Sequence, residues 1–152
     1  MSRAIVEEAL DRIDETWQTP EDPVLDADGC ILLRHDSGLD VMLTYVPAPS
    51  EAIVIYAELG AVENTEAVFR QALEAMHLWQ AGDSLTLGVL PGTDELTACM
   101  SAPADTDLLH DLSPILGHFA ERALIWAEIA GGSADPEQPA DSDEPGDGAV
   151  WG

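Results

Sequence analysis

The histidines and cysteines of the 152-residue chain are the side chains best suited to metal binding or nucleophilic chemistry. His110 and His118 would lie about 80° apart around one helix, with Asp111 beside them. A metal site could be imagined from these groups, but solvated surface histidines are the better interpretation. Cys30 and Cys99 stand in apolar, strand-like segments without a closely spaced partner, so we expect two reduced structural thiols.

Catalytic arrangements are equally weak in this sequence. His35, Asp36 and Ser37 have the residue types of a catalytic triad, but triad groups normally come from separate segments, and a polar hairpin turn explains them. Acid pairs such as Glu7 and Glu8 show no sign of an apolar pocket that would raise one pKa. The sequence also lacks a glycine-rich phosphate loop, a Gly-x-Ser-x-Gly turn and a His-Glu-x-x-His motif. It therefore predicts neither an enzyme nor a cofactor or metal site.

The charge of the chain is strongly acidic, with 30 acidic and 5 basic residues and a formal net charge of −25. Such a field favours basic protein partners and disfavours nucleic acid and anionic membranes. No segment approaches the roughly 20 apolar residues that cross a bilayer. Residues 1–14 carry acids where a secretory signal would carry basic and then apolar residues. We expect a cytosolic protein without membrane insertion.

Hydrophobic periodicity predicts an α+β fold in which the elements follow the order helix, three strands, helix, two strands, helix. The expected ranges are 2–17, then 30–34, 39–46 and 52–59, then a helix from Asn64 or Thr65 that Gly82 ends, then 85–89 and 96–101, and finally 105–130. Short connections between the strands favour an antiparallel twisted sheet flanked by helices. Pro114 should kink the last helix or mark its true start, with Ser113 as an alternative cap.

The domain organisation follows from a change in composition near residue 130. Residues 1–130 form one domain, whereas residues 131–152 are rich in Gly, Pro, Asp and Glu and are predicted to be an acidic disordered tail. This tail could keep the protein soluble or could contact basic surfaces, with Trp151 as an anchor. Within the domain, strand 52–59 is apolar on both faces, so either a terminal helix or a partner must cover its second face.

Several segments resemble the class I chaperones of bacterial type III secretion, the family that includes the Tir chaperone. The segments are Asp28-Gly29, Leu59-Gly60, residues 72–80, residues 85–89, and the spacing of Phe119, Ala120 and Trp126. The resemblance extends over nearly all of residues 4–130. It implies a cytoplasmic homodimer that holds the N-terminal region of one or more secreted effectors in an extended form and presents it to the secretion apparatus. The secretion ATPase is a candidate further partner, and no catalytic residues are implied.

The resemblance also directs attention to two apolar sets of residues. A two-fold interface needs one self-complementary patch, for which we select Phe69, Met76, Trp79, Leu85, Leu87 and Val89. Ordinary core packing is the better interpretation of Phe69 and Leu85. The effector-binding candidates are Ile5, Leu10, Ile13, Trp17, Leu32, Val41, Leu43, Tyr45, Val54 and Tyr56. Roughly half of these must be core, because a sheet has two faces and alternation alone does not distinguish them.

Two other hypotheses remain open at this stage. An acidic protein could mimic nucleic acid and occupy a DNA-binding partner, which requires carboxylates spaced like phosphates on one folded face. In this sequence the acids are scattered, and many fall in loops or in the predicted tail. An enzyme using scattered carboxylates would need a concave pocket with perturbed groups and a metal ion.

Overall fold

The computed structural model describes residues 2–77 and 85–131, which form an α+β fold. The elements in order are α1 (Ser2–Asp11), β1 (Trp17–Gln18), β2 (Cys30–His35), β3 (Asp40–Val46), β4 (Ala52–Ala61), α2 (Thr65–His77), β5 (Thr86–Val89), β6 (Glu95–Pro103) and α3 (Leu108–Gly131). The described strands build one open antiparallel sheet in the order β1-β2-β3-β4-β6-β5. The predicted fold class and antiparallel pairing are confirmed, and β1 is an additional strand.

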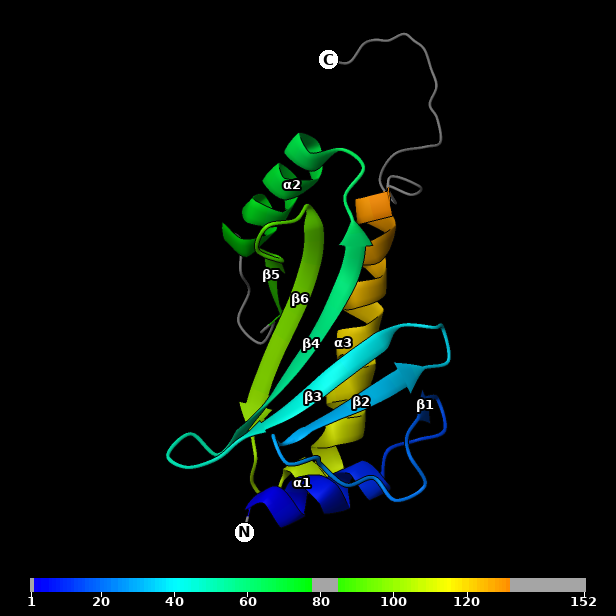
Figure 1. The fold of residues 1–152 in the computed structure, drawn as a ribbon, viewed down its shortest axis with the longest axis vertical. Coiled ribbons are helices and arrows are strands. Elements are labelled where there is room, and N and C mark those ends of the chain that lie inside the picture. Colours follow the sequence, from blue (N-terminus) through cyan, green and yellow to red (C-terminus); the bar gives the residue numbers. More distant parts are fainter. Residues whose placement is uncertain (1, 78–84, 132–152) are drawn as a thin grey trace, which may run out of the picture.

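The helices are distributed unevenly around the sheet (Figure 1). Helix α3 runs along one face and packs on β4 and β6, while α1 packs against α3 near one end of the sheet. Helix α2 packs on the edge strand β5. Figure 1 shows no described helix in front of β3 and β4, on the side opposite α3. We call the side facing α3 the inner face and the opposite side the outer face.

The register of the strands decides which residues enter the core. Leu43 pairs with Ile55, which pairs with Met100 on β6, and all three side chains are buried on the inner face. The next row, displaced by one residue, lies on the outer face, where Met42 pairs with Tyr56. Fully buried helix residues complete the core from the α3 side, at Leu112, Leu116, Phe119 and Ala123. The single chain therefore has a complete core on the inner face alone.

The first helix ends earlier than the predicted range of 2–17, at Asp11. The Asp14 carboxylate accepts hydrogen bonds from the Thr16 backbone N–H and from the Thr16 hydroxyl. A short polar side chain that binds nearby backbone in this way competes with helix formation. The chain consequently turns, and Trp17 pairs with His35 in β1 and is only 5% exposed. The prediction that Trp17 continues the helical stripe is wrong.

The other two helices start at side-chain caps. Asn64 Oδ1 accepts from the Ala67 N–H at 3.3 Å ahead of α2, which confirms Asn64 as the cap. Asp105 accepts from the Asp107 N–H at 3.1 Å just before α3. Pro114 lies inside α3 and removes one backbone hydrogen bond, so it does not mark the start of the helix.

Ser113 does not cap α3 either, because its hydroxyl donates to the Asp14 carboxylate at 3.1 Å. Helix α3 reaches Gly131, the first residue of the predicted tail. The rest of that tail, together with Trp79 and the predicted helix end at Gly82, lies outside the described residues.

Candidate binding surfaces

The outer face is an apolar surface formed by cross-strand neighbours. Leu32 pairs with Met42, Met42 with Tyr56, and Tyr56 with Cys99, so one row crosses β2, β3, β4 and β6. Leu32 is 53% exposed, and the others are partly buried. A second row consists of Cys30, Thr44, Val54 and Ser101. Because no described helix covers these rows, their side chains are available to a partner.

A hollow of about 390 Å³ opens on the outer face. Its lining is apolar along the row of Leu32, Met42 and Tyr56, and its border is acidic on the side where Asp40 and Glu58 lie two residues away along β3 and β4. Ala57 completes the lining. The Tyr56 hydroxyl donates to the Glu58 carboxylate at 3.4 Å. Partial burial, followed by the negative charge of Glu58, raises the pKa of Tyr56 above its ordinary value.

Asp40, at the border of this hollow, is held by an arginine of the neighbouring strand. Arg34 donates from Nε to Asp40 Oδ1 at 2.7 Å and from its terminal nitrogen to Oδ2 at 2.9 Å. These two hydrogen bonds lower the pKa of Asp40 below its ordinary value. Asp40 is therefore an ionised group whose charge is already matched by Arg34.

The predicted effector-binding residues fall into three groups. Leu32, Val54 and Tyr56 share the outer face. Four others are at most 5% exposed in the core of the single chain, namely Leu10, Trp17, Val41 and Leu43. Ile5, Ile13 and Tyr45 are partly buried and pack against that core.

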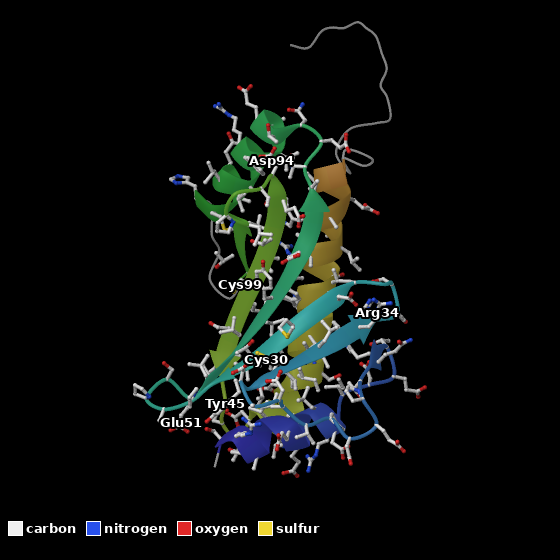
Figure 2. All side chains as sticks on the ribbon, in the orientation of Figure 1. Cys30, Arg34, Tyr45, Glu51, Asp94 and Cys99 are labelled. Atoms are coloured by element: carbon white, nitrogen blue, oxygen red, sulfur yellow. The ribbon has the colours of Figure 1, made fainter. Side chains whose placement is uncertain are left out.

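Tyr45 has a structural role at the start of α1. Its hydroxyl lies 2.6 Å from the buried Ser2 Oγ, which donates to Glu51 Oε1 at 2.8 Å. Figure 2 shows Tyr45 and Glu51 beside the beginning of α1. Met42 was not among the predicted residues, although its alternation opposite Val41 and Leu43 already placed it on the other face of its strand.

A second apolar surface lies between α2 and β5, at the far edge of the sheet. It encloses a hollow of about 230 Å³ lined by Phe69, Ala72, Leu73, Met76, Leu87, Gly88, Val89 and Leu96. Leu73 is 71% exposed and Val89 is 44% exposed. The Leu87 N–H lies 3.4 Å from the Met76 sulfur, which holds the helix against the strand. We call these residues the α2–β5 surface.

The predicted dimer residues mostly gather on this surface. Phe69, Met76, Leu87 and Val89 line the hollow. Leu85 is 3% exposed and belongs to the core, and Trp79 lies outside the described residues. Leu73 is the residue that the predicted set lacked. Leu73 belongs to the apolar stripe of the predicted helix, and this position could have added it to the set.

The residues considered for catalysis or metal binding do not form a reactive site. His35 Nδ1 accepts from the Ser37 N–H at 3.2 Å within the β2–β3 turn, which confirms the predicted hairpin turn. Across residues 2–77 and 85–131, no three His, Cys, Asp or Glu side chains gather as a potential metal site. Figure 2 places Cys30 and Cys99 on separate strands, and both are free thiols. No described helix is long and apolar enough to cross a membrane.

Comparisons with solved structures identify the same fold in other proteins. A chain in the crystal structure of the ExsC–ExsE complex matches with a TM-score of 0.67 and 21% identity, covering 84% of this chain and 92% of that one. A chain in the HopA1–SchA chaperone–effector complex matches with a TM-score of 0.55 and 17% identity, covering 69% and 80%.

A third match is a chain in the structure of the Yersinia pestis type III secretion chaperone SycH in complex with a stable fragment of YscM2. Its TM-score is 0.54 and its identity 13%, with coverage of 82% of this chain and 98% of that one. No curated protein sequence matches the chain.

The sequence model of one protein family matches the chain across most of the described fold. That family is the Tir chaperone protein (CesT) family, and the match spans residues 9–127, from α1 through nearly all of α3. The match thus includes the last residues of α1, all six strands of the described sheet, α2 and most of α3. The chain therefore belongs to the Tir chaperone protein (CesT) family, a family of non-enzymatic, effector-binding chaperones of type III secretion.

Proposed function

We propose that this protein is a homodimeric chaperone of the bacterial cytoplasm that binds the N-terminal region of one or more secreted effectors in extended form and delivers it to the secretion apparatus. The observation that carries the proposal is the outer face, where Leu32, Met42 and Tyr56 form an apolar row without a covering helix among the described residues. An exposed apolar patch of this kind is typical of a protein-binding surface.

An extended segment suits this surface better than a folded domain does. Alternate side chains of an extended chain point the same way, so every second residue can reach a shallow row of pockets. The outer face offers such a row, with Thr44 and Ser101 among its polar neighbours. The formal net charge of −25 would keep the loaded complex soluble and would attract basic segments.

The proposed homodimer uses the α2–β5 surface. Its hollow is lined almost entirely by apolar side chains, and Leu73 projects from its border with 71% of its surface exposed. A two-fold interface brings the same patch of two copies together, so Leu73 of one copy could enter the hollow of the other. This arrangement would leave the outer face of each copy free for the effector.

Two solved structures of the same fold support a role in holding another chain. HopA1–SchA is a chaperone–effector complex, and SycH is in complex with a stable fragment of YscM2. The secretion ATPase stays a candidate partner in delivery. Delivery would follow if the segment remains non-globular while it is bound.

Affinity capture from the native cytosol tests the binding step. We expect the tagged full-length chain to recover one or a few secreted proteins whose protease-protected part lies within their N-terminal region. Leu32→Asp should abolish this recovery, because it places a carboxylate in the apolar row. Val24→Asp is the matched control, since Val24 is 59% exposed and lies outside both surfaces. Recovery of a DNA-binding protein instead, or equal recovery with both variants, would contradict the proposal.

Secretion itself tests delivery. A strain that lacks the chaperone should retain the captured effector inside the cell. The wild-type chain and Val24→Asp should restore secretion, whereas Leu32→Asp should not. Undiminished secretion without the chaperone would rule out a delivery role even if binding is real.

A further inference from the structure

The hollow on the outer face differs from an ordinary apolar pocket because its border is acidic. Leu32 and Met42 form the apolar part, while Asp40 and Glu58 bring carboxylates to its border. An effector side chain that is apolar throughout would cover part of the Glu58 carboxylate without offering it a hydrogen bond, which is unfavourable. The lining therefore suits a side chain with an apolar stem and a cationic end.

The two carboxylates are not equivalent. Asp40 already receives two hydrogen bonds from Arg34. Glu58, by contrast, forms no ion pair with any cation among residues 2–77 and 85–131, and it accepts a hydrogen bond from the Tyr56 hydroxyl at 3.4 Å. Glu95, near the start of β6, adds to the negative field around Tyr56. Glu58 is thus the carboxylate with capacity for a cation.

The chain itself supplies few cations for this position. It contains five arginines and no lysine. Four of these arginines already pair with acids of their own, at Arg3, Arg12, Arg34 and Arg70. The fifth, Arg122, belongs to α3, on the inner side of the sheet. A cation at Glu58 would therefore come from a bound partner.

We propose, resting on the proposed function, that this hollow binds an arginine side chain of the effector segment. Its aliphatic stem lies on Leu32 and Met42, and its guanidinium stacks on the Tyr56 ring and donates to Glu58. Arginine fits better than lysine because its planar fork can stack on an aromatic ring and donate two hydrogen bonds to one carboxylate. The arginine would add selectivity to a surface that otherwise recognises apolar residues.

Methionine NMR on the full-length chain tests this proposal without knowledge of the effector. The chain, labelled with ¹³C at the methionine methyl groups, is titrated with the capped tripeptide acetyl-Val-Arg-Val-amide. We expect a saturable shift of the Met42 signal. Met76 and Met100 are internal controls, because Met76 lines the α2–β5 hollow and Met100 is buried on the inner face. The peptide in which citrulline replaces arginine keeps the shape without the charge and should bind more weakly.

Variants at two carboxylates make the test specific. Glu58→Gln should weaken the binding of the arginine peptide about fivefold, which is the effect of losing a partly exposed ion pair. Glu63→Gln is the matched control, since Glu63 is also exposed but lies beyond the end of β4, and it should leave the titration unchanged. Added salt should lower the affinity for the arginine peptide and leave the affinity for the citrulline peptide unchanged.

Each outcome decides the question. An unchanged Met42 signal up to the solubility limit of the peptide, or equal affinity for the arginine and citrulline peptides, would overturn the arginine proposal. A third peptide carries lysine in place of arginine. Equal affinity for the arginine and lysine peptides would contradict stacking of the guanidinium on Tyr56 and overturn the preference for arginine. Natural effector capture separates the two proposals: if Leu32→Asp loses the effector and Glu58→Gln retains it fully, the chaperone function stands and the arginine site falls.

Discussion

The outer face and the α2–β5 surface are both exposed and apolar, but the hollows that they contain differ in their lining. The hollow on the outer face carries the Asp40 and Glu58 carboxylates at its border, whereas the α2–β5 hollow is lined by apolar side chains and one glycine. A surface that binds a second copy of itself gains from excluding charge, since like charges would meet across the two-fold axis. A surface that binds varied segments gains from charges that select among them. The different linings of the two hollows thus fit the two different partners that we propose for these surfaces.

The largest effect is expected from a charge placed on the α2–β5 surface. Leu73→Asp should convert the proposed dimer to monomer, because a carboxylate buried in an apolar contact costs several kcal/mol, roughly 3–5 when it has no partner. Light scattering coupled to size-exclusion chromatography measures the mass. Val24→Asp should remain dimeric. If Leu73→Asp retains the mass of a dimer, the α2–β5 surface is not the seam.

A charge on the outer face should weaken effector binding without affecting the proposed dimer. Leu32→Asp should weaken effector binding at least about tenfold, equivalent to roughly 1.4 kcal/mol, and leave the dimer intact. Calorimetry with the captured effector fragment measures the affinity, and light scattering checks the mass. A variant that also dissociates the dimer would show that the two surfaces are not separate.

The cysteines offer a milder test because both lie on the outer face. Bound effector should slow the alkylation of Cys30 and Cys99 several-fold, which mass spectrometry of the two tryptic peptides measures. Burial raises the pKa of the Cys99 thiol above its ordinary value of 9.0, so its rate should still be rising at a pH where ordinary thiols are mostly ionised. Leu73→Asp should not alter either rate. Full reactivity in the complex would place the effector elsewhere.

The smallest effect is expected at a contact that belongs to neither surface. Hydrogen bonds from Thr16, first from its side chain and then from its backbone, lower the pKa of Asp14 from its ordinary value of 3.8. The carboxylate therefore stabilises the fold above about pH 4, and this contribution is lost as the pH falls through the lower folded pKa. Asp14 is almost fully solvated, so Asp14→Asn should lower the free energy of unfolding at pH 7 by less than about 1 kcal/mol.

Urea unfolding at pH 7 and below pH 3 measures this difference. The gap between the wild-type chain and Asp14→Asn should narrow at the lower pH, while the mass of the dimer and the affinity for effector stay unchanged at pH 7. If the difference in free energy of unfolding between the two chains instead increased at the lower pH, the folded state would raise the pKa of Asp14 rather than lower it, which would contradict this prediction.

The antiparallel pairing of β2 with β3, of β3 with β4 and of β5 with β6 was predictable from the sequence, because alternation and short turns leave few alternatives. The pairing of β4 with β6 and the extra strand β1 were not predicted. Which face of β3 enters the core was not predictable, because Val41 and Leu43 alternate with Met42 in a strand that is apolar on both faces. Only the position of α3 makes one of these faces the core. Helix α3 covers one face of β4, and no described helix covers the second face, so the first of the two alternatives that the sequence left open, a terminal helix, does not apply among the described residues.

Two other differences between the predicted and the observed fold come from a local polar contact and from the width of the apolar stripe on α2. Asp14 ends α1 through a side-chain contact with Thr16 that periodicity does not reveal, and this moved Trp17 into the sheet. In α2 the apolar stripe predicted one buried face, but Val68 and Ala72 are buried whereas Leu73 is 71% exposed. The stripe is wider than the contact that α2 makes with its own sheet, so its border faces outward.

The complete core on the inner face has a consequence for turnover. Fully buried residues such as Leu43, Ile55 and Phe119 lie on the side away from the outer face, so they need no effector to be covered. A chaperone that gives up its segment during export would remain a folded protein. The same molecule could then be loaded again, and a small pool of chaperone could serve many rounds of secretion.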